Sequence, residues 1–131
     1  MSMYEEKVLI VDDSTTIHDH WRDLFAPHNY EVIAADNGHI GFDIANKRHD
    51  IGLIITDYNM PEWNGLEFLE KLRTLPRYDS TLIILCSAET RPDLIAQIKK
   101  QKITGFLPKP FDEKQTMPIL LDKLKKLRES K

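Results

Sequence analysis

Short apolar segments recur along the chain, and longer amphipathic or polar stretches separate them. The apolar segments are rich in Val and Ile and are continuous rather than alternating, which is typical of strands buried on both faces. They predict strands over residues 8–11, 30–35, 52–56, 82–86 and 105–108. Strands of this kind belong to a parallel sheet that is covered on both sides.

Helical patterns occupy the stretches between and after these strands. In the first, Ile17, Trp21 and Leu24 recur at helical spacing, and the helix should end at Pro27. The second, over residues 38–49, is the weakest pattern because two glycines lie early in it. The third is marked by leucines at helical spacing: Leu66, Leu69 and Leu72.

Prolines help to place the last two helices. The fourth helix should begin near Pro92, with Thr90 as its cap, because proline is well tolerated in the first turn. Pro118 does not fit deep inside a helix, so the fifth helix is expected to begin near Thr116. It carries an apolar stripe made by Leu120, Leu121, Leu124 and Leu127.

The order of elements predicts an α/β fold. Strands that alternate with helices form a parallel sheet with right-handed crossovers and helices on both faces, a doubly wound (βα)5 architecture. No linker or low-complexity tract interrupts the pattern. We therefore expect a single domain over residues 1–131, with its core over about 7–127 and no separate output domain.

Composition and charge exclude several classes of protein. Hydrophobic residues make up 41% and charged residues 30%, with a net charge of -3, so a soluble globular protein is expected rather than one that binds DNA through a basic face. The single cysteine, Cys86, lies in an apolar segment and suits a reducing compartment. No membrane helix or signal peptide is recognisable, which predicts a cytoplasmic protein.

Polar side chains stand where four of the predicted strands end. Asp12 and Asp13 follow the first strand, Asp57 the third, Ser87 the fourth and Lys109 the fifth. Ligands of open parallel sheets bind outside the carboxyl ends of the strands, so these side chains are expected to form one site. Singly, each has a plainer explanation: Asp13 could cap a helix, Asp57 could belong to a turn, and Lys109 could be a solvated charge.

Three carboxylates at neighbouring strand ends call for a cation. At roughly 5–6 Å and an effective dielectric constant near 20, each pair would repel by about 3 kcal/mol. Lys109 supplies one positive charge. The remaining negative charge calls for a metal ion, and the hard oxygen ligands favour Mg²⁺, or Mn²⁺ as a substitute. All five histidines are expected at the surface, away from the metal: His18, His20, His28, His39 and His49.

A carboxylate beside Mg²⁺ can act as a nucleophile toward phosphorus. Asp57 suits this role because it stands alone beside the acidic pair. The metal, Lys109 and the Ser87 hydroxyl can neutralise charge on a transferring phosphoryl group. The sequence thus predicts an aspartyl-phosphate site.

The chain resembles the receiver domain of bacterial two-component response regulators, in its single-domain form. The resemblance runs from Lys7 to about Leu127 and rests on VLIVDDS, ITDYNMPEWNGLEFL, ILCSAE and GFLPKPF. It implies a flavodoxin-like sheet of strand order 2-1-3-4-5 and Mg²⁺-dependent transfer of a phosphoryl group to Asp57. In such domains Asp13 and Asp57 ligate the metal directly, and Asp12 acts mainly through water.

The resemblance implies further roles around this centre. The backbone carbonyl of Asn59 is a metal ligand, and Lys109, whose bond to Pro110 is cis, pairs with the phosphoryl oxygens. Ser87 and Phe106 form the switch, although Phe106 lacks the hydroxyl of the commoner tyrosine. Asn59 and Glu89 tune the phosphoryl lifetime, which is expected to be short.

A phospho-acceptor switch is therefore expected, rather than a turnover enzyme. A sensor histidine kinase or a phosphotransfer protein would donate, and the fourth helix, fifth strand and fifth helix would bind an unidentified protein, in chemotaxis for example. The alternatives are a relay intermediate or phosphate sink, a scaffold, and an aspartate-nucleophile phosphohydrolase, whose DxDx[TV] motif is absent because Asn59 stands two after Asp57. The protein is expected to be a monomer or a weak, phosphorylation-dependent dimer.

Overall fold

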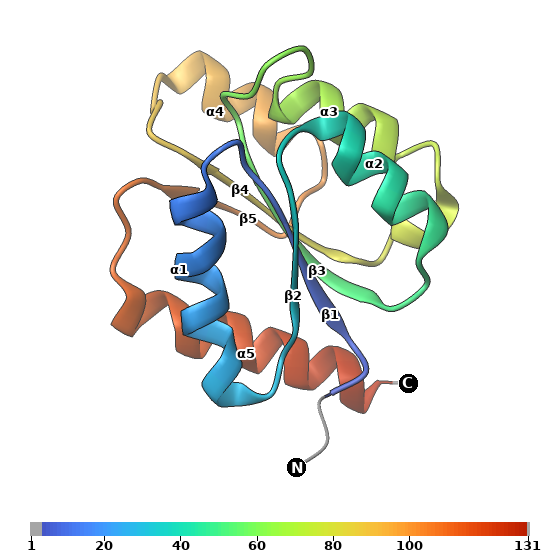
Figure 1. The fold of residues 1–131 in the computed structure, drawn as a ribbon. Helices are drawn as coiled ribbons and strands as arrows, with labels where there is room; N and C mark the ends of the chain where they lie inside the picture. Colours follow the sequence, from blue (N-terminus) through green and yellow to red (C-terminus); the bar gives the residue numbers. More distant parts are fainter. Residues whose placement is uncertain (1–3, 131) are drawn as a thin grey trace.

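A five-stranded parallel sheet forms the centre of the protein (Figure 1). The computed structural model describes residues 4–130, so residues 1–3 and 131 of the predicted domain lie outside the described residues. The strand order is β2-β1-β3-β4-β5, which confirms the predicted doubly wound topology. The strands are β1 (Lys7–Val11), β2 (Val32–Ala35), β3 (Ile51–Asp57), β4 (Leu82–Ser87) and β5 (Gly105–Pro108).

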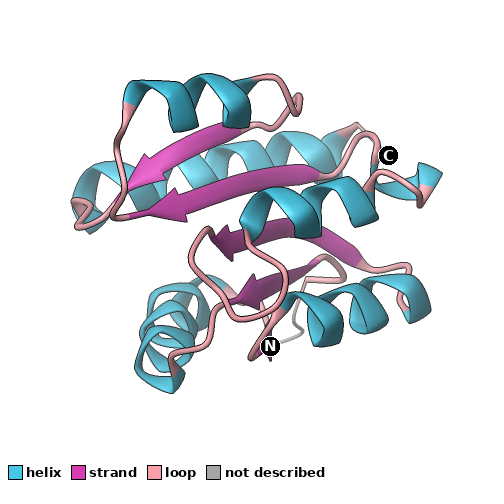
Figure 2. Ribbon diagram, turned by 90° about the horizontal axis from the view of Figure 1, so that it is seen from above, coloured by secondary structure: helices cyan, strands magenta, loops and turns pink. Residues whose placement is uncertain are grey.

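Helices cover both faces of the sheet, as Figure 2 shows from above. They are α1 (Thr15–Phe25), α2 (Gly38–Lys47), α3 (Gly65–Leu72), α4 (Pro92–Lys99) and α5 (Glu113–Glu129), with short 3-10 turns at Ala26–His28 and Pro76–Tyr78. Helices α1 and α5 pack on one face, and α2, α3 and α4 pack on the other. Each layer encloses its own apolar core, because neighbouring residues of a strand point to opposite faces.

The two cores make the central strands rigid. Val8 and Ile10 of β1 pack with Trp21 and Phe25 of α1, whereas the alternate residues of the same strand join the core under α2 and α3. Every residue of β3 except Asp57 is buried. A strand fixed on both faces holds the residue at its end in a defined place, which is what a site at the strand ends requires.

Two sequence-based expectations for helix starts were wrong. Helix α5 begins at Glu113 rather than near Thr116, because the side chain of Asp112 accepts a hydrogen bond from the Lys114 N–H (2.9 Å) and starts the helix earlier. Pro118 then falls in the second turn, where it removes one backbone hydrogen bond. Helix α4 begins at Pro92 as expected, but its N-cap is Arg91 and not Thr90.

The second helix forms as predicted, and its glycines are there for packing. A Cβ atom on Gly41 would lie 2.9 Å from a methyl group of Val11, and one on Gly38 would lie 3.2 Å from the Trp63 side chain. The glycines therefore allow α2 to approach the sheet and the loop after β3 closely. Within residues 4–130, no helix is long and apolar enough to cross a membrane.

Candidate functional site

The acidic residues meet at the ends of β1 and β3, which are neighbours in the sheet. Asp12 follows β1 directly, and its backbone N–H donates to the carbonyl of Ala35 (3.0 Å), so the pairing with β2 continues to this point. Asp57 is the last residue of β3. Carboxylate oxygens of Asp12, Asp13 and Asp57 lie within 4.8 Å of one another, somewhat closer than expected.

The turn after β1 separates the roles of its polar residues. The Ser14 hydroxyl caps α1 by accepting a hydrogen bond from the Ile17 N–H (3.4 Å). The Ser14 N–H donates to Oδ1 of Asp12 (3.0 Å), which fixes that buried carboxylate. Asp13 is exposed and does not cap the helix, so its carboxylate is available to a ligand.

Lys109 brings a positive charge into the acidic cluster. Its Nζ lies 3.3 Å from Oδ2 of Asp12 and 3.3 Å from Oδ1 of Asp57. Burial raises the pKa of Asp57; Lys109 opposes this and Asp12 adds to it, so the net shift is upward. Burial alone would lower the pKa of Lys109, but the carboxylates of Asp12 and Asp57 outweigh it, and the ammonium stays charged.

The donor set of this cluster fits a hard divalent cation. Three carboxylates and one ammonium leave two negative charges uncompensated, and every ligand atom is an oxygen. Oxygen ligands of this kind suit Mg²⁺ or Mn²⁺ better than softer metals. Asp12, Asp13 and Asp57 are therefore the residues that could hold a metal.

The remaining residues of the predicted site lie at the end of β4, in the loops after β3 and β4, and in β5. Ser87 is fully buried, and its hydroxyl accepts a hydrogen bond from the Glu89 N–H (3.0 Å). The Glu89 side chain turns outward and pairs with Arg91 (3.2 Å). Asn59 lies exposed in the loop after β3, and Phe106 is partly buried in β5. The peptide bond between Lys109 and Pro110 is cis.

The sequence-based prediction that His18 lies at the surface was wrong. It is buried, and its Nε2 lies 2.6 Å from the backbone carbonyl of Asp12, so the imidazole donates this hydrogen bond. The ring thereby supports the turn that carries the acidic pair. The sequence held a signal for this, because His18 lies three residues before Trp21 and seven before Phe25, on the buried stripe of α1.

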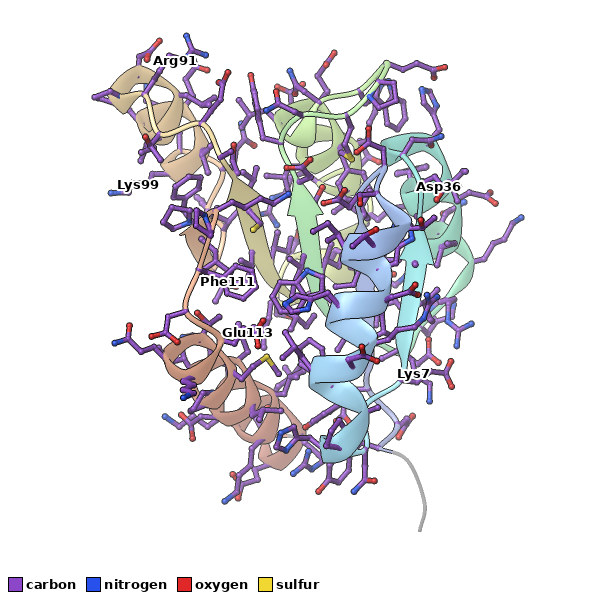
Figure 3. All side chains as sticks on the ribbon, turned by 60° about the vertical axis from the view of Figure 1, so that its left-hand side comes forward. Lys7, Asp36, Arg91, Lys99, Phe111 and Glu113 are labelled. Carbon is purple, nitrogen blue, oxygen red and sulfur yellow. The ribbon has the colours of Figure 1, made fainter. Side chains whose placement is uncertain are left out.

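An apolar hollow of about 410 Å³ opens beside Lys109, between α1 and the segment that joins β5 to α5. Trp21 and Phe111 form one wall, with their rings stacked at 5.0 Å. At its rim, Nε2 of His20 lies 2.5 Å from Oε1 of Glu113. Figure 3 labels Phe111 on this segment and Glu113 at the start of α5.

Comparison with known proteins decides what kind of domain carries this site. The protein-family model described as the response regulator receiver domain matches residues 8–120 of the sequence. This chain belongs to the response regulator receiver family. The receiver domain is 32% identical over 119 residues to a chemotaxis protein CheY homolog of Campylobacter jejuni, covering 90% of this chain and 88% of the relative.

Other receiver proteins are similarly close. Chemotaxis protein CheY1 of Helicobacter pylori is 31% identical over 90% of this chain and 93% of its own length. The structure of chemotaxis protein CheY4 of Vibrio cholerae superposes with a TM-score of 0.82 at 33% identity, covering 91% of this receiver and 98% of that chain. The likeness extends over nearly the whole fold, including the strand ends that carry the acidic cluster.

Proposed function

We propose that this receiver domain accepts a phosphoryl group on Asp57 from a phosphohistidine, in a reaction that requires Mg²⁺. The donor is a sensor histidine kinase or a phosphotransfer protein. The observation that carries the proposal is the position of Asp57, at the end of β3, with Lys109 3.3 Å away and two further carboxylates within 4.8 Å. A lone nucleophile flanked by a metal-binding pair and a fixed cation is the arrangement that phosphoryl transfer needs.

The chemistry follows from the contacts of Asp57. Its Oδ1 accepts hydrogen bonds from the Tyr58 N–H (2.9 Å) and from Lys109, which leaves Oδ2 to attack phosphorus. The new O–P bond forms as the P–N bond of the phosphohistidine breaks, and its electron pair returns to the imidazole, which leaves as neutral histidine once protonated. Lys109 then pairs with the phosphoryl oxygens, where charge must be balanced.

Three carboxylates and one backbone carbonyl are assigned to the metal. Asp12, Asp13, Asp57 and the carbonyl of Asn59 would hold Mg²⁺, which supplies further neutralisation of the phosphoryl charge. Asp12 acts mainly through water in this assignment, as the family resemblance implies; its Oδ1 accepts from the Ser14 N–H and its Oδ2 pairs with Lys109.

The donor approaches over the apolar hollow beside Lys109. This hollow borders the acceptor end of the sheet and offers about 410 Å³ lined mainly by apolar side chains, so it can take side chains of a docked donor protein. Polar groups at the rim come from His20 and Glu113, which contact one another.

The output surface comprises α4, β5 and α5. Phosphorylation draws the Ser87 hydroxyl toward the phosphoryl group, and Phe106 moves into the space that Ser87 leaves. Phe106 lines a hollow of about 190 Å³, next to Ile119, whose side chain is 56% exposed. A change at Phe106 therefore reaches the surface where a target protein binds.

The names of the similar proteins point to a pathway. Chemotaxis proteins are the relatives with 31% to 33% identity, so we assign this receiver to chemotaxis-type signalling in the cytoplasm, as a monomer or a weak phosphorylation-dependent dimer. The alternative is a phosphorelay intermediate or a phosphate sink. Transfer of the phosphoryl group from Asp57 to a second histidine protein, with no bound target, would favour that alternative.

Intact mass spectrometry tests the acceptor directly. The protein is incubated with acetyl phosphate, with and without Mg²⁺, beside Asp57→Asn as the acceptor-free control. A gain of one phosphoryl group that needs both Mg²⁺ and Asp57 is the expected result. Folded wild-type protein that gains no group from acetyl phosphate or from phosphoramidate would overturn the proposal.

Phosphoryl lifetime is the second measurement. Asn59 and Glu89 flank the site, and Glu89 is held outward by Arg91, so water reaches the aspartyl phosphate and the lifetime should be short. The decay is followed by mass after the small-molecule donor is removed. A phosphoprotein that persists for hours without a phosphatase would contradict this expectation.

A further inference from the structure

The loop after β3, residues 58–64, is held at its base and at its tip by different means. At the base, the Gly65 N–H donates to the Tyr58 carbonyl (2.8 Å). In the described chain, no backbone hydrogen bond joins residues 59–63 to another segment. Side-chain contacts must therefore position the part of the loop that contains Asn59.

Besides that of Met60, which packs against the core, one of these contacts reaches across to the start of α2. The rings of His39 and Trp63 stack with their centroids 3.7 Å apart and an angle of 25° between their planes. Nε2 of His39 also lies 3.0 Å from Oε2 of Glu62. Phe42, one turn further along α2, meets Trp63 edge to face at 6.3 Å. One helix end thus contacts two adjacent residues of the loop.

The backbone on both sides is shaped for this contact. Glu62 has φ 67°, a left-handed conformation that is strained for a residue other than glycine and persists only where the surroundings enforce it. On the helix side, Gly38 lets Trp63 come close, since an added Cβ would lie 3.2 Å from that side chain. The two segments are fitted to one another rather than merely adjacent.

The contact joins two segments that lead to different members of the acidic cluster. Helix α2 begins just after β2, which pairs with β1 at its end, so the start of α2 is tied to the segment that carries Asp12 and Asp13. The loop is tied to Asp57 on β3. The stack of His39 on Trp63 therefore joins the helix that follows β2 to the loop that follows Asp57.

We propose that His39 is a positioning residue for the metal site: by stacking on Trp63 it holds in one position the loop that carries Asn59. The inference rests on the proposed function, because it assigns Asn59 to the metal. If the loop leaves this position part of the time, the apparent metal affinity falls by the fraction of molecules that remain competent. Loss of one aromatic stack should lower that affinity by about threefold to tenfold.

Binding of Mn²⁺, followed as free ion by electron paramagnetic resonance, tests this without any phosphoryl donor. His39→Ala is expected to raise the dissociation constant by about threefold to tenfold, and His39→Phe, which keeps a stacked ring, should restore it. His49→Ala, at an exposed histidine two residues beyond the end of α2, is the matched control and should change nothing. Thermal unfolding of the metal-free variants shows that the fold is intact.

A second readout separates positioning from chemistry. At saturating Mg²⁺, His39→Ala should be phosphorylated by phosphoramidate within about twofold of the wild-type rate, while its half-saturating Mg²⁺ concentration rises in parallel with the Mn²⁺ result. Wild-type affinity in His39→Ala would overturn the inference, and so would failure of His39→Phe to restore it. Either result leaves the proposed function standing, whereas a wild-type protein that binds no Mn²⁺ would remove both.

Discussion

Replacement of Asp57 by asparagine should make the metal-free protein more stable, although it removes the proposed acceptor. Carboxylate oxygens of Asp57, Asp12 and Asp13 lie within 4.8 Å of one another. At an effective dielectric constant of about 20, Asp12 at 4.8 Å repels Asp57 by about 3.5 kcal/mol and Lys109 at 3.3 Å returns about 5 kcal/mol, while water largely screens the exposed Asp13. Burial of the Asp57 charge outweighs this small net attraction and leaves its pKa raised, so the charge costs the folded state about 1–2 kcal/mol.

Asparagine removes this cost and little else. Its side-chain oxygen can still accept the hydrogen bond that Tyr58 donates to Asp57, and its volume is nearly the same. Urea unfolding at pH 7 in EDTA is therefore expected to show a free energy of unfolding about 1–2 kcal/mol higher in Asp57→Asn than in the wild type. Mg²⁺ should shrink the difference, because it binds the folded wild type and stabilises it.

The pH dependence of stability tests independently whether the charge of Asp57 destabilises the fold. The native pKa of Asp57 is raised, so its charge costs stability at neutral pH, and that cost disappears as the pH falls through the raised pKa. The gain from Asp57→Asn should vanish over the same range. Asp50→Asn is the opposite control: the hydrogen bonds from Arg48 lower the pKa of Asp50, so that carboxylate stabilises the fold at neutral pH and loses its effect in acid.

An Asp57→Asn protein that is no more stable than the wild type at pH 7 in EDTA would refute this reasoning. It would mean that Lys109 fully compensates the cluster, and that no electrostatic demand for a cation exists.

Three further changes test other parts of the structure. Burial raises the pKa of the Cys86 thiol to about 12, so the native protein should react with a thiol reagent at pH 8 far more slowly than the urea-unfolded chain, although Cys86 lines the hollow beside Lys109; equal rates would contradict the burial. Gly65→Ala places a Cβ 2.7 Å from the Asp57 carbonyl oxygen and should cost about 2 kcal/mol in urea unfolding, whereas Gly105→Ala, with 3.5 Å to its nearest neighbour, should not. Pro118→Ala restores the N–H that the Lys114 carbonyl lacks in α5 and should raise stability by about 1 kcal/mol or more; an unchanged urea midpoint would show that the helix already compensates for it.

The sheet could be predicted because its strands are buried on both faces. In a soluble protein, short continuous apolar runs such as residues 52–56, separated by helical patterns, indicate strands of a parallel sheet that is covered on both faces. The strand ends followed from the same reasoning, since parallel strands bring residues as distant as Asp12 and Lys109 to one edge. Both inferences depend on patterns that repeat along the whole chain, and such patterns can be recognised from the sequence alone.

Local capping and contacts between distant segments were harder to foresee. The start of α5 depends on whether Asp112 caps the helix strongly enough to tolerate Pro118 in the second turn, and those two tendencies oppose one another in the sequence. The stack of His39 on Trp63 is of a different kind, because it joins the start of one helix to a loop whose shape depends on a strained residue. No periodicity marks such a pair.

The charges that destabilise the metal-free protein are the same charges that define its ligand. Removal of Asp57 should raise stability and abolish the acceptor, whereas removal of a stacking partner such as His39 should lower metal affinity with little effect on the cluster itself. Loss of metal affinity should therefore accompany a gain in stability in the Asp57 variant but no gain in the His39 variant. A set of variants measured for both properties would show whether electrostatic cost or loop position limits the metal site, since each variant can follow only one of the two patterns.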